Sequence, residues 1–174
     1  MKKARVVLFT GDGKGKTTAA LGMVMRASGH GLKSLIVQFV KSDATTGEIE
    51  ACRHLPGVTI VQTGLGFVPQ TTAPEFADHV RAAEKGMKTA EDAVASGQYD
   101  MILLDEICIA VVKTLLDEKR VLTLIEKARP DMCLVLTGRG AAPELIAAAD
   151  TVTEMRLVKH GLNDGIHAQA GVEH

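Results

Sequence analysis

The chain has 174 residues, of which 46% are hydrophobic and 24% are charged, and its formal net charge is −1. This length corresponds to one domain that buries enough surface to fold without disulfides or a structural metal. The apolar content excludes a disordered chain, and the near-zero charge excludes the broad basic surface that non-specific nucleic-acid binding needs.

Short apolar runs alternate with helical patterns along the chain. Buried strands are predicted at residues 4–10, 35–40, 58–62, 100–105 and 133–137, and an edge strand at 151–157. Helices are predicted at residues 16–30, 73–96, 115–129 and 141–149, and Pro74 suits the first turn of the second helix. This alternation is typical of βαβ units. It predicts a single α/β domain over residues 1–174, with a mostly parallel central sheet, helices on both faces and a flexible tail at 160–174.

The cysteines lie far apart and form no CxxC pair. Cys108 and Cys133 lie inside apolar runs, and free cysteine behaves as a small hydrophobe, so buried structural thiols are expected for them and for Cys52. An odd count without motif spacing fits a reducing compartment. The amino terminus lacks the apolar length of a secretory signal, and no apolar stretch approaches the roughly 20 residues that span a bilayer. A cytoplasmic protein with no membrane or nucleic-acid partner is therefore expected.

The most specific local signal is the glycine-rich segment Thr-Gly-Asp-Gly-Lys-Gly-Lys-Thr-Thr at residues 10–18. It lies between a predicted strand and a predicted helix, where backbone N–H groups and the helix terminus together bind phosphate. Lys16 is expected to reach the outer phosphates, and the Thr17 hydroxyl is expected to ligate Mg²⁺. The predicted nucleotide-binding residues of this P-loop NTPase-like domain are Thr10, Gly11, Asp12, Gly13, Lys14, Gly15, Lys16, Thr17 and Thr18.

Thr10 stands where the generic phosphate loop has its first glycine. The alternative to a phosphate site is a glycine-rich turn between strand and helix that binds no ligand. The in-register Lys16 and Thr17 after alternating glycines favour the phosphate site.

Two further strand ends carry polar side chains. The predicted strand at 100–105 ends in Asp105 and Glu106, and in a parallel sheet this end faces the same crevice as the phosphate loop. Either carboxylate could hold Mg²⁺ directly or through water; the alternative is a strand that simply ends in solvent. Arg139 follows the strand at 133–137 and lies between two glycines. It is either a clamp on phosphate oxygens or an arginine of a surface turn.

The sequence resembles the ATP:corrinoid adenosyltransferase family, which includes the P-loop cob(I)yrinic acid a,c-diamide and cob(I)alamin adenosyltransferases. The segments that carry the resemblance span nearly the whole chain in order. In this family the phosphate loop also begins with a threonine. Generic P-loop ATPases lack the segments at residues 150–160 and 165–173. The matching segments lie at residues 10–20, 99–106, 136–140, 150–160 (Asp-Thr-Val-Thr-Glu-Met-Arg-Leu-Val-Lys-His) and 165–173 (Gly-Ile-His-Ala-Gln-Ala-Gly-Val-Glu).

The resemblance implies transfer of the 5′-deoxyadenosyl group of ATP to the Co(I) centre of a corrinoid, with release of triphosphate. Because Co(I) is the nucleophile, the protein's tasks are to align C5′ with cobalt and to stabilise charge on the leaving triphosphate. Lys14, Lys16 and Arg139 suit that role. So does Mg²⁺, or Mn²⁺ in its place, held by Thr17 with Asp105 or Glu106. ATP is then the co-substrate, and the corrinoid is cobalamin or its a,c-diamide precursor.

The segment Thr-Gly-Leu-Gly-Phe-Val-Pro-Gln at residues 63–70 matches the position of the family's corrinoid-facing Gly-x-Gly-Phe segment. The resemblance implies that Phe67 lies against the corrin ring and assists reduction of cobalt; the alternative is ordinary loop packing. Pro69 stands where the family has a tryptophan, and the chain contains no tryptophan. This departure puts the reduction-assisting step in question, although not ATP binding. With Lys16 and Arg139, Phe67 completes the predicted catalytic set.

His160 lies in a matching segment and is a candidate ligand-binding residue, with a surface histidine as the alternative. The resemblance also implies a homodimer and an electron-donating flavoprotein partner. Two other functions use the same loop: a small-molecule kinase or ATPase, and a non-catalytic ATP-dependent corrinoid-binding protein. The first would release ADP rather than triphosphate, and the second would show little turnover with Co(I).

Overall fold

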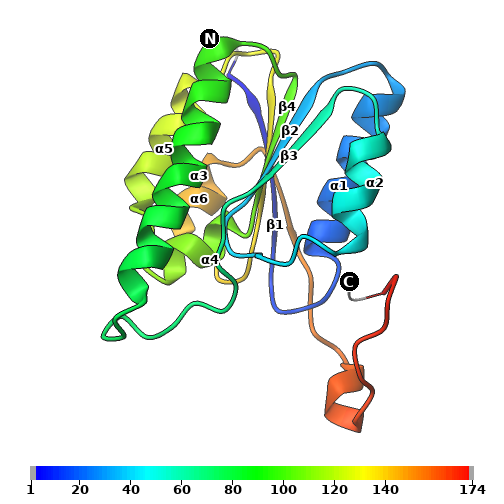
Figure 1. The fold of residues 1–174 in the computed structure, drawn as a ribbon. Coiled ribbons are helices and arrows are strands. Elements are labelled where there is room, and N and C mark those ends of the chain that lie inside the picture. The colour runs from blue at the N-terminus through cyan, green and yellow to red at the C-terminus, as the bar shows by residue number, and fades with distance from the viewer. Residues whose placement is uncertain (1–2, 173–174) are drawn as a thin grey trace.

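The computed structural model describes residues 3–172, apart from the side chains of residues 162 and 163 (Figure 1). The strands are β1 (Arg5–Thr10), β2 (Ser34–Gln38), β3 (Val58–Gln62), β4 (Met101–Asp105), β5 (Cys133–Thr137) and β6 (Thr151–Glu154). The helices are α1 (Lys16–Gly29), α2 (Gly47–His54), α3 (Phe76–Ser96), α4 (Ile107–Val112), α5 (Glu118–Lys127), α6 (Pro143–Ala148) and the short 3-10 helix η1 (Gly161–Asp164).

The six strands form one parallel sheet in the order β3-β2-β4-β5-β1-β6. The predicted α/β fold with a parallel sheet is therefore confirmed. Because every strand runs in the same direction, all six carboxyl ends meet at one edge of the sheet. β5 lies between β1 and β4, so the loop after β1 and the acids at the end of β4 face each other across the end of β5.

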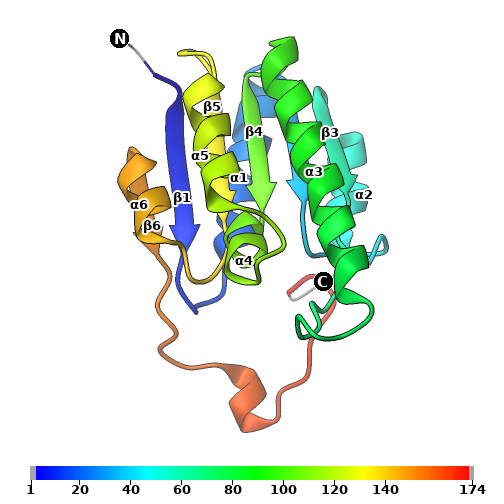
Figure 2. The same ribbon diagram turned by 90° about the vertical axis from the view of Figure 1, so that its left-hand side faces the viewer.

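Helices cover both faces of the sheet, with α1 and α2 on one side and α3, α5 and α6 on the other (Figures 1 and 2). Side chains alternate along each strand, and each face therefore has its own core. On the α1 side, Ala20 and Val24 pack against Ile36, Leu103 and Val135. The larger core on the other face contains fully buried side chains from α3, α4, α5 and the strands, among them Met87, Ile107, Leu124, Leu8, Ile102, Leu104, Leu134 and Leu136.

Three differences from the predicted elements have physical causes. The sequence of α4, Ile-Cys-Ile-Ala-Val-Val, has the β-branched composition of a strand, but the left-handed backbone of Glu106 (φ 63°) ends β4 and starts the helix. Helix α2 was not predicted because it is short and polar, with only Ile49 and Cys52 buried. The prediction for Pro74 was wrong, because α3 begins at Phe76 and leaves this proline in the preceding turn.

The carboxyl-terminal segment, residues 155–172, lies beyond the carboxyl edge of the sheet. It leaves β6, contains η1 and then turns back towards α1 and α2 (Figure 1). Of the predicted tail, residues 173 and 174 lie outside the described part of the chain. Within residues 3–172, no helix is long and apolar enough to cross a membrane.

The cysteines are free thiols, with Cys52 and Cys108 buried and Cys133 partly buried. Burial raises the pKa of Cys108 to about 12. Because the thiolate is the reactive form, Cys108 is expected to remain unlabelled when the native protein is treated with iodoacetamide at pH 8. Mass spectrometry should find it alkylated only after unfolding in guanidinium. Rapid labelling of Cys108 in the native protein would contradict the buried position.

Candidate functional site

The glycines of the phosphate loop are required by the close approach of the carboxyl-terminal segment. Gly13 N donates a hydrogen bond to Met155 O at 2.6 Å. A Cβ atom on Gly11 would lie 2.5 Å from Met155 O, and one on Gly13 would lie 2.7 Å from Arg156 O. Gly11 also has a φ of 91°, which L side chains rarely adopt. The loop therefore has no room for side chains at these two positions.

Thr10, the departure from the generic loop, has a structural role in this chain. Its side chain is buried, and its Oγ1 accepts a hydrogen bond from Ala141 N at 3.2 Å. A glycine could not supply this acceptor. The threonine thus connects the start of the phosphate loop to the segment that follows β5.

Lys16, the first residue of α1, folds back over the loop. Its Nζ donates to Gly11 O at 2.6 Å and to Gly13 O at 2.7 Å. Burial, and after it the neighbouring Arg139 guanidinium, lowers the pKa of Lys16 below its ordinary value. The two carbonyl groups hold the ammonium at the mouth of the loop, where it can contact an anion bound to the loop amides.

Asp105 is fully buried, and side chains from α1, β2, β5 and the loop after β2 surround its carboxylate. Thr17 Oγ1 and Thr137 Oγ1 each donate to Asp105 Oδ1 at 2.8 Å. Gln38 Nε2 donates to Asp105 Oδ2 at 3.2 Å, and Lys41 Nζ lies 3.4 Å from the same oxygen. These contacts use the accepting capacity of both oxygens. Asp105 therefore does not line the cavity but fixes the side chains that surround it, among them Thr17.

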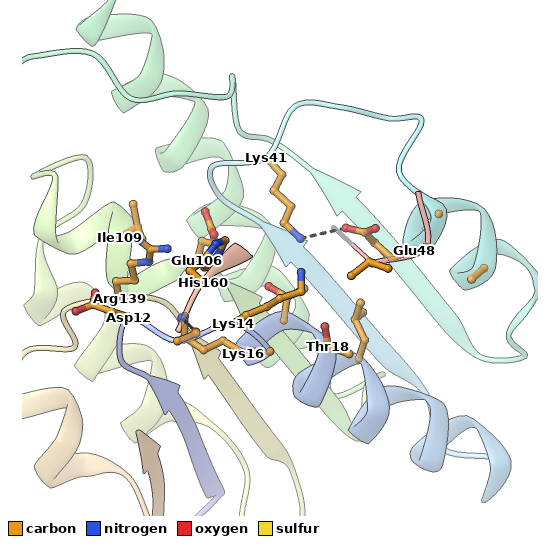
Figure 3. Close-up of a pocket in the computed structure, with 18 residues that line it drawn as sticks. Asp12, Lys14, Lys16, Thr18, Lys41, Glu48, Glu106, Ile109, Arg139 and His160 are labelled. Carbon is orange, nitrogen blue, oxygen red and sulfur yellow. Dashed lines mark hydrogen bonds and ion pairs between the residues drawn. The ribbon is translucent and has the colours of Figure 1, made fainter. Parts of the chain in front are cut away.

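Lys41, which follows β2, connects this buried carboxylate to helix α2. Its Nζ also donates to Glu48 Oε1 at 3.0 Å, in the first turn of α2 (Figure 3). Burial lowers the pKa of Lys41, but the carboxylates of Asp105 and Glu48 outweigh burial and hold the pKa above its ordinary value. Lys41 therefore stays charged and holds α2 against the site.

Glu106 differs from its neighbour Asp105 in its exposure to the cavity and in its contacts. Its carboxylate lines the cavity, and among residues 3–172 no hydrogen bond or ion pair to it is found. Burial, and after it the charge of Asp105, raises the pKa of Glu106. Its backbone has a φ of 63°, and its N–H donates to Thr137 Oγ1 at 2.8 Å. A left-handed non-glycine residue at a strand end is typical of a functional position.

The predicted loop residues meet the other strand ends in one cavity of about 750 Å³. Residues 12–18, Glu106, Arg139 and His160 all line it. Figure 3 shows Lys14 on the loop and Lys16 at the start of α1, with the Lys41–Glu48 pair on the opposite wall. Arg139 lies between Gly138 and Gly140, both with positive φ, and a Cβ on Gly138 would lie 2.8 Å from Cys108 Cβ. This tight packing against α4 directs the arginine to the cavity.

Two predicted residues differ in their placement. His160 lines the cavity from the carboxyl-terminal segment, where Gly171 and Val172 join it. Phe67 does not line this cavity, and 93% of its surface is exposed on the loop after β3. The Phe67 side chain therefore packs against almost nothing in the described part of the chain, which disfavours ordinary loop packing.

Sequence reasoning missed the wall of the cavity opposite the phosphate loop. Lys41, Glu48 and Ala51 form that wall. Gln38 does not line the cavity but donates a hydrogen bond to Asp105. One sequence feature pointed to Gln38. A polar residue at the end of a strand that is otherwise apolar and buried needs a hydrogen-bond partner in the interior.

The parallel sheet, the glycine loop between β1 and α1 and the acids at the end of β4 define a P-loop NTPase-like protein. The chain belongs to the ATP:corrinoid adenosyltransferase BtuR/CobO/CobP family, whose sequence model matches residues 2–174.

Curated relatives carry the name corrinoid adenosyltransferase. The protein from Pseudomonas aeruginosa is 45% identical over 170 residues, which is 97% of this chain and 82% of that protein. The protein from a Sinorhizobium species is 41% identical, over 99% of this chain and 81% of that protein. The protein from Escherichia coli K12 is 34% identical, over 97% of this chain and 85% of that protein.

Solved structures resemble this chain in fold alone. The flagellar accessory protein FlaH from Methanocaldococcus jannaschii aligns with a TM-score of 0.59 at 10% identity, covering 88% of this chain and 72% of that one. The KaiC-like protein PH0186 from Pyrococcus horikoshii aligns with a TM-score of 0.56 at 16% identity, covering 88% and 71%.

Proposed function

We propose that this protein transfers the 5′-deoxyadenosyl group of ATP to the Co(I) centre of a corrinoid and releases triphosphate. In this step the C5′–O bond breaks and its electron pair leaves on the triphosphate oxygen, while Co(I) supplies the pair that forms the Co–C bond. Membership of the adenosyltransferase family supports the reaction. The observation that carries the mechanism is the placement of Lys14, Lys16 and Arg139 around one cavity.

These three cations suit the leaving group of that reaction. The loop amides and Lys16 would bind phosphate oxygens on one side, and Arg139 would contact them from the end of β5. Preorganised positive charge is worth most where negative charge develops, which here is the triphosphate. We infer that the loop holds the triphosphate so that C5′ faces the open part of the cavity, where the corrinoid approaches.

The side chains around the carboxyl end of β4 are suited to bind a divalent cation. Thr17 lies beside the phosphate loop with its hydroxyl fixed by Asp105, and the Glu106 carboxylate faces the cavity. We infer that Thr17 and Glu106 would hold Mg²⁺ or Mn²⁺ and that Asp105 orients Thr17. Within the described residues no group of three or more His, Cys, Asp or Glu side chains could hold the ion, so triphosphate oxygens and water would complete its coordination. The bound cation would neutralise charge on the triphosphate.

Exchange of Glu106 for glutamine tests this assignment. Glu106→Gln should raise the Mg²⁺ concentration needed for half-maximal transfer by about tenfold or more, since a ligand is lost. Its free energy of unfolding should stay the same or rise, because burial disfavours the charged carboxylate and no described partner is removed. Urea unfolding and a Mg²⁺ titration measure the two effects. Glu126→Gln, on the exposed face of α5, is the matched control. Unchanged Mg²⁺ dependence would reject Glu106 as a ligand.

The corrinoid would lie over segment 63–70. Phe67, almost fully exposed beside the half-exposed Leu65, offers an apolar surface for a corrin face. We also propose that His160 contacts the bound substrates and that the protein acts as a cytoplasmic homodimer with an electron-donating flavoprotein. The free thiols of Cys52, Cys108 and Cys133 support a reducing compartment.

The assay that tests the function supplies ATP, Mg²⁺ and chemically reduced cob(I)alamin. Formation of light-sensitive adenosylcobalamin is followed by its visible spectrum, and the nucleotide products are separated by HPLC. Adenosylcobalamin appearing in equal amount with triphosphate is expected. Release of ADP and orthophosphate instead would identify a kinase or ATPase. Binding of both substrates without turnover, also with the a,c-diamide precursor, would identify a binding protein.

A further inference from the structure

A row of hydrogen-bonded side chains crosses the carboxyl ends of three neighbouring strands. The strand register places Gln38 beside Gln62 on one side and beside Asp105 on the other. Gln62 Nε2 donates to Gln38 Oε1 at 3.0 Å, and Gln38 Nε2 donates to Asp105 Oδ2 at 3.2 Å. Gln38 is fully buried. The row therefore runs without interruption from the end of β3 to the carboxylate that holds Thr17.

Chemistry fixes the direction of this row. The Asp105 carboxylate accepts hydrogen bonds, so the amide nitrogen of Gln38 must face it. The amide oxygen then faces Gln62, which has to donate. Rotating the Gln38 amide by half a turn would oppose oxygen to carboxylate and nitrogen to nitrogen. Each side chain in the row thus constrains the next one.

Gln38 also fastens the start of segment 63–70 through its main chain. Its carbonyl oxygen accepts hydrogen bonds from Thr63 N at 3.0 Å and from Gly64 N at 3.2 Å. Two positions further on, Val40 O accepts from Gly66 N at 2.7 Å. One buried residue therefore contacts the segment proposed to carry the corrinoid and the carboxylate that orders the nucleotide site.

We propose that Gln38 is a positioning residue that couples corrinoid binding to Mg·ATP binding. This inference rests on the proposed function, because it takes segment 63–70 as the corrinoid surface. A corrinoid that immobilises this segment also restrains Gln62 and Gln38, and the restrained amide keeps Asp105 aligned with Thr17. Mg·ATP then binds to a site that is already ordered. By linkage, Mg·ATP must strengthen corrinoid binding by the same factor.

The test is a set of calorimetric titrations of Mg·ATP, without and with saturating cob(II)alamin, in the absence of any reductant so that no transfer occurs. In the wild type, cob(II)alamin should lower the Kd of Mg·ATP by about fivefold or more. Gln38→Leu should reduce that ratio to about one, and Gln62→Met should reduce it in part. The control is Gln98→Met, which changes an exposed glutamine just before the amino end of β4. This variant should keep the wild-type ratio. Thermal unfolding checks that each variant is folded.

Two results overturn the proposal: a wild-type ratio of one, and variants of Gln38 and Gln62 that keep the wild-type ratio. If Gln38→Leu fails to fold, Gln62→Met decides, because Gln62 donates to Gln38 Oε1 and to the Asp43 carbonyl, and its removal leaves the contacts of Asp105 in place. Failure of the proposed function is recognised separately. A wild type that binds both ligands with coupling but makes no adenosylcobalamin from Co(I) refutes the reaction, whereas active protein without coupling refutes only the role of Gln38.

Discussion

Lys16→Ala should lower the rate of adenosyl transfer by about 100- to 1000-fold, the range found when one preorganised donor to a developing anion is removed. The ammonium is held at the mouth of the loop by two carbonyl groups, where it can contact the leaving triphosphate. The cob(I)alamin assay at saturating ATP measures the loss. Since the side chain is only partly buried, the stability of the variant should change little.

Two further variants define the chemistry of this position. Lys16→Arg should not restore activity, because a planar guanidinium does not fit between the Gly11 and Gly13 carbonyls as a compact ammonium does. Lys33→Ala removes an exposed lysine before β2, at the opposite edge of the sheet, and should leave the rate unchanged. Activity of Lys16→Ala within tenfold of the wild type would show that the leaving group is stabilised elsewhere.

Asp105→Ala should be the most destabilising single change in the site. It removes the acceptor of three side-chain donors and one partner of Lys41 in a fully buried position. Breaking such a buried charged network costs about 3–5 kcal/mol. The free energy of unfolding, measured by urea denaturation at pH 7, should fall by that amount.

The matched control is an exposed aspartate that also forms an ion pair. Asp78→Ala removes a partner of Arg81 on the surface of α3 and should cost less than about 1 kcal/mol. Asp105→Asn keeps the shape of the side chain but loses its charge, so its stability should lie between the wild type and the alanine variant. An Asp105→Ala protein as stable as the wild type would show that the network contributes no net stability.

The strands were predictable because burial on both faces leaves continuous apolar runs, and each predicted strand coincides with an observed one to within a few residues. The meeting of Lys16, Glu106 and Arg139 was also predictable, since parallel strands bring their carboxyl ends to one edge. The elements that failed were α2 and α4, whose local sequence does not favour a helix. A contact outside the helix holds α2, through Lys41 and Glu48, whereas the left-handed backbone of Glu106 starts α4.

The different positions of Asp105 and Glu106 could be assigned only from the structure. In sequence, Asp105 and Glu106 are equivalent carboxylates at a strand end. Asp105 is the last residue of a strand that is buried along its whole length, and the left-handed turn at Glu106 directs the second carboxylate into the cavity. The same holds for Gln38, whose partners lie on neighbouring strands that are distant in sequence. No spacing rule connects residues across a sheet before its strand order is known.

The contact between Met155 and the phosphate loop has a consequence for the order of events during synthesis. The loop is translated near the beginning of the chain, whereas its partners Ala141, β6 and Met155 emerge at its far end. Chains fold largely from the amino terminus while they are being made. A chain in which residues 141–156 have not yet folded therefore lacks the contacts of Thr10 and Gly13, and we expect it to bind ATP only after this part has packed against the loop.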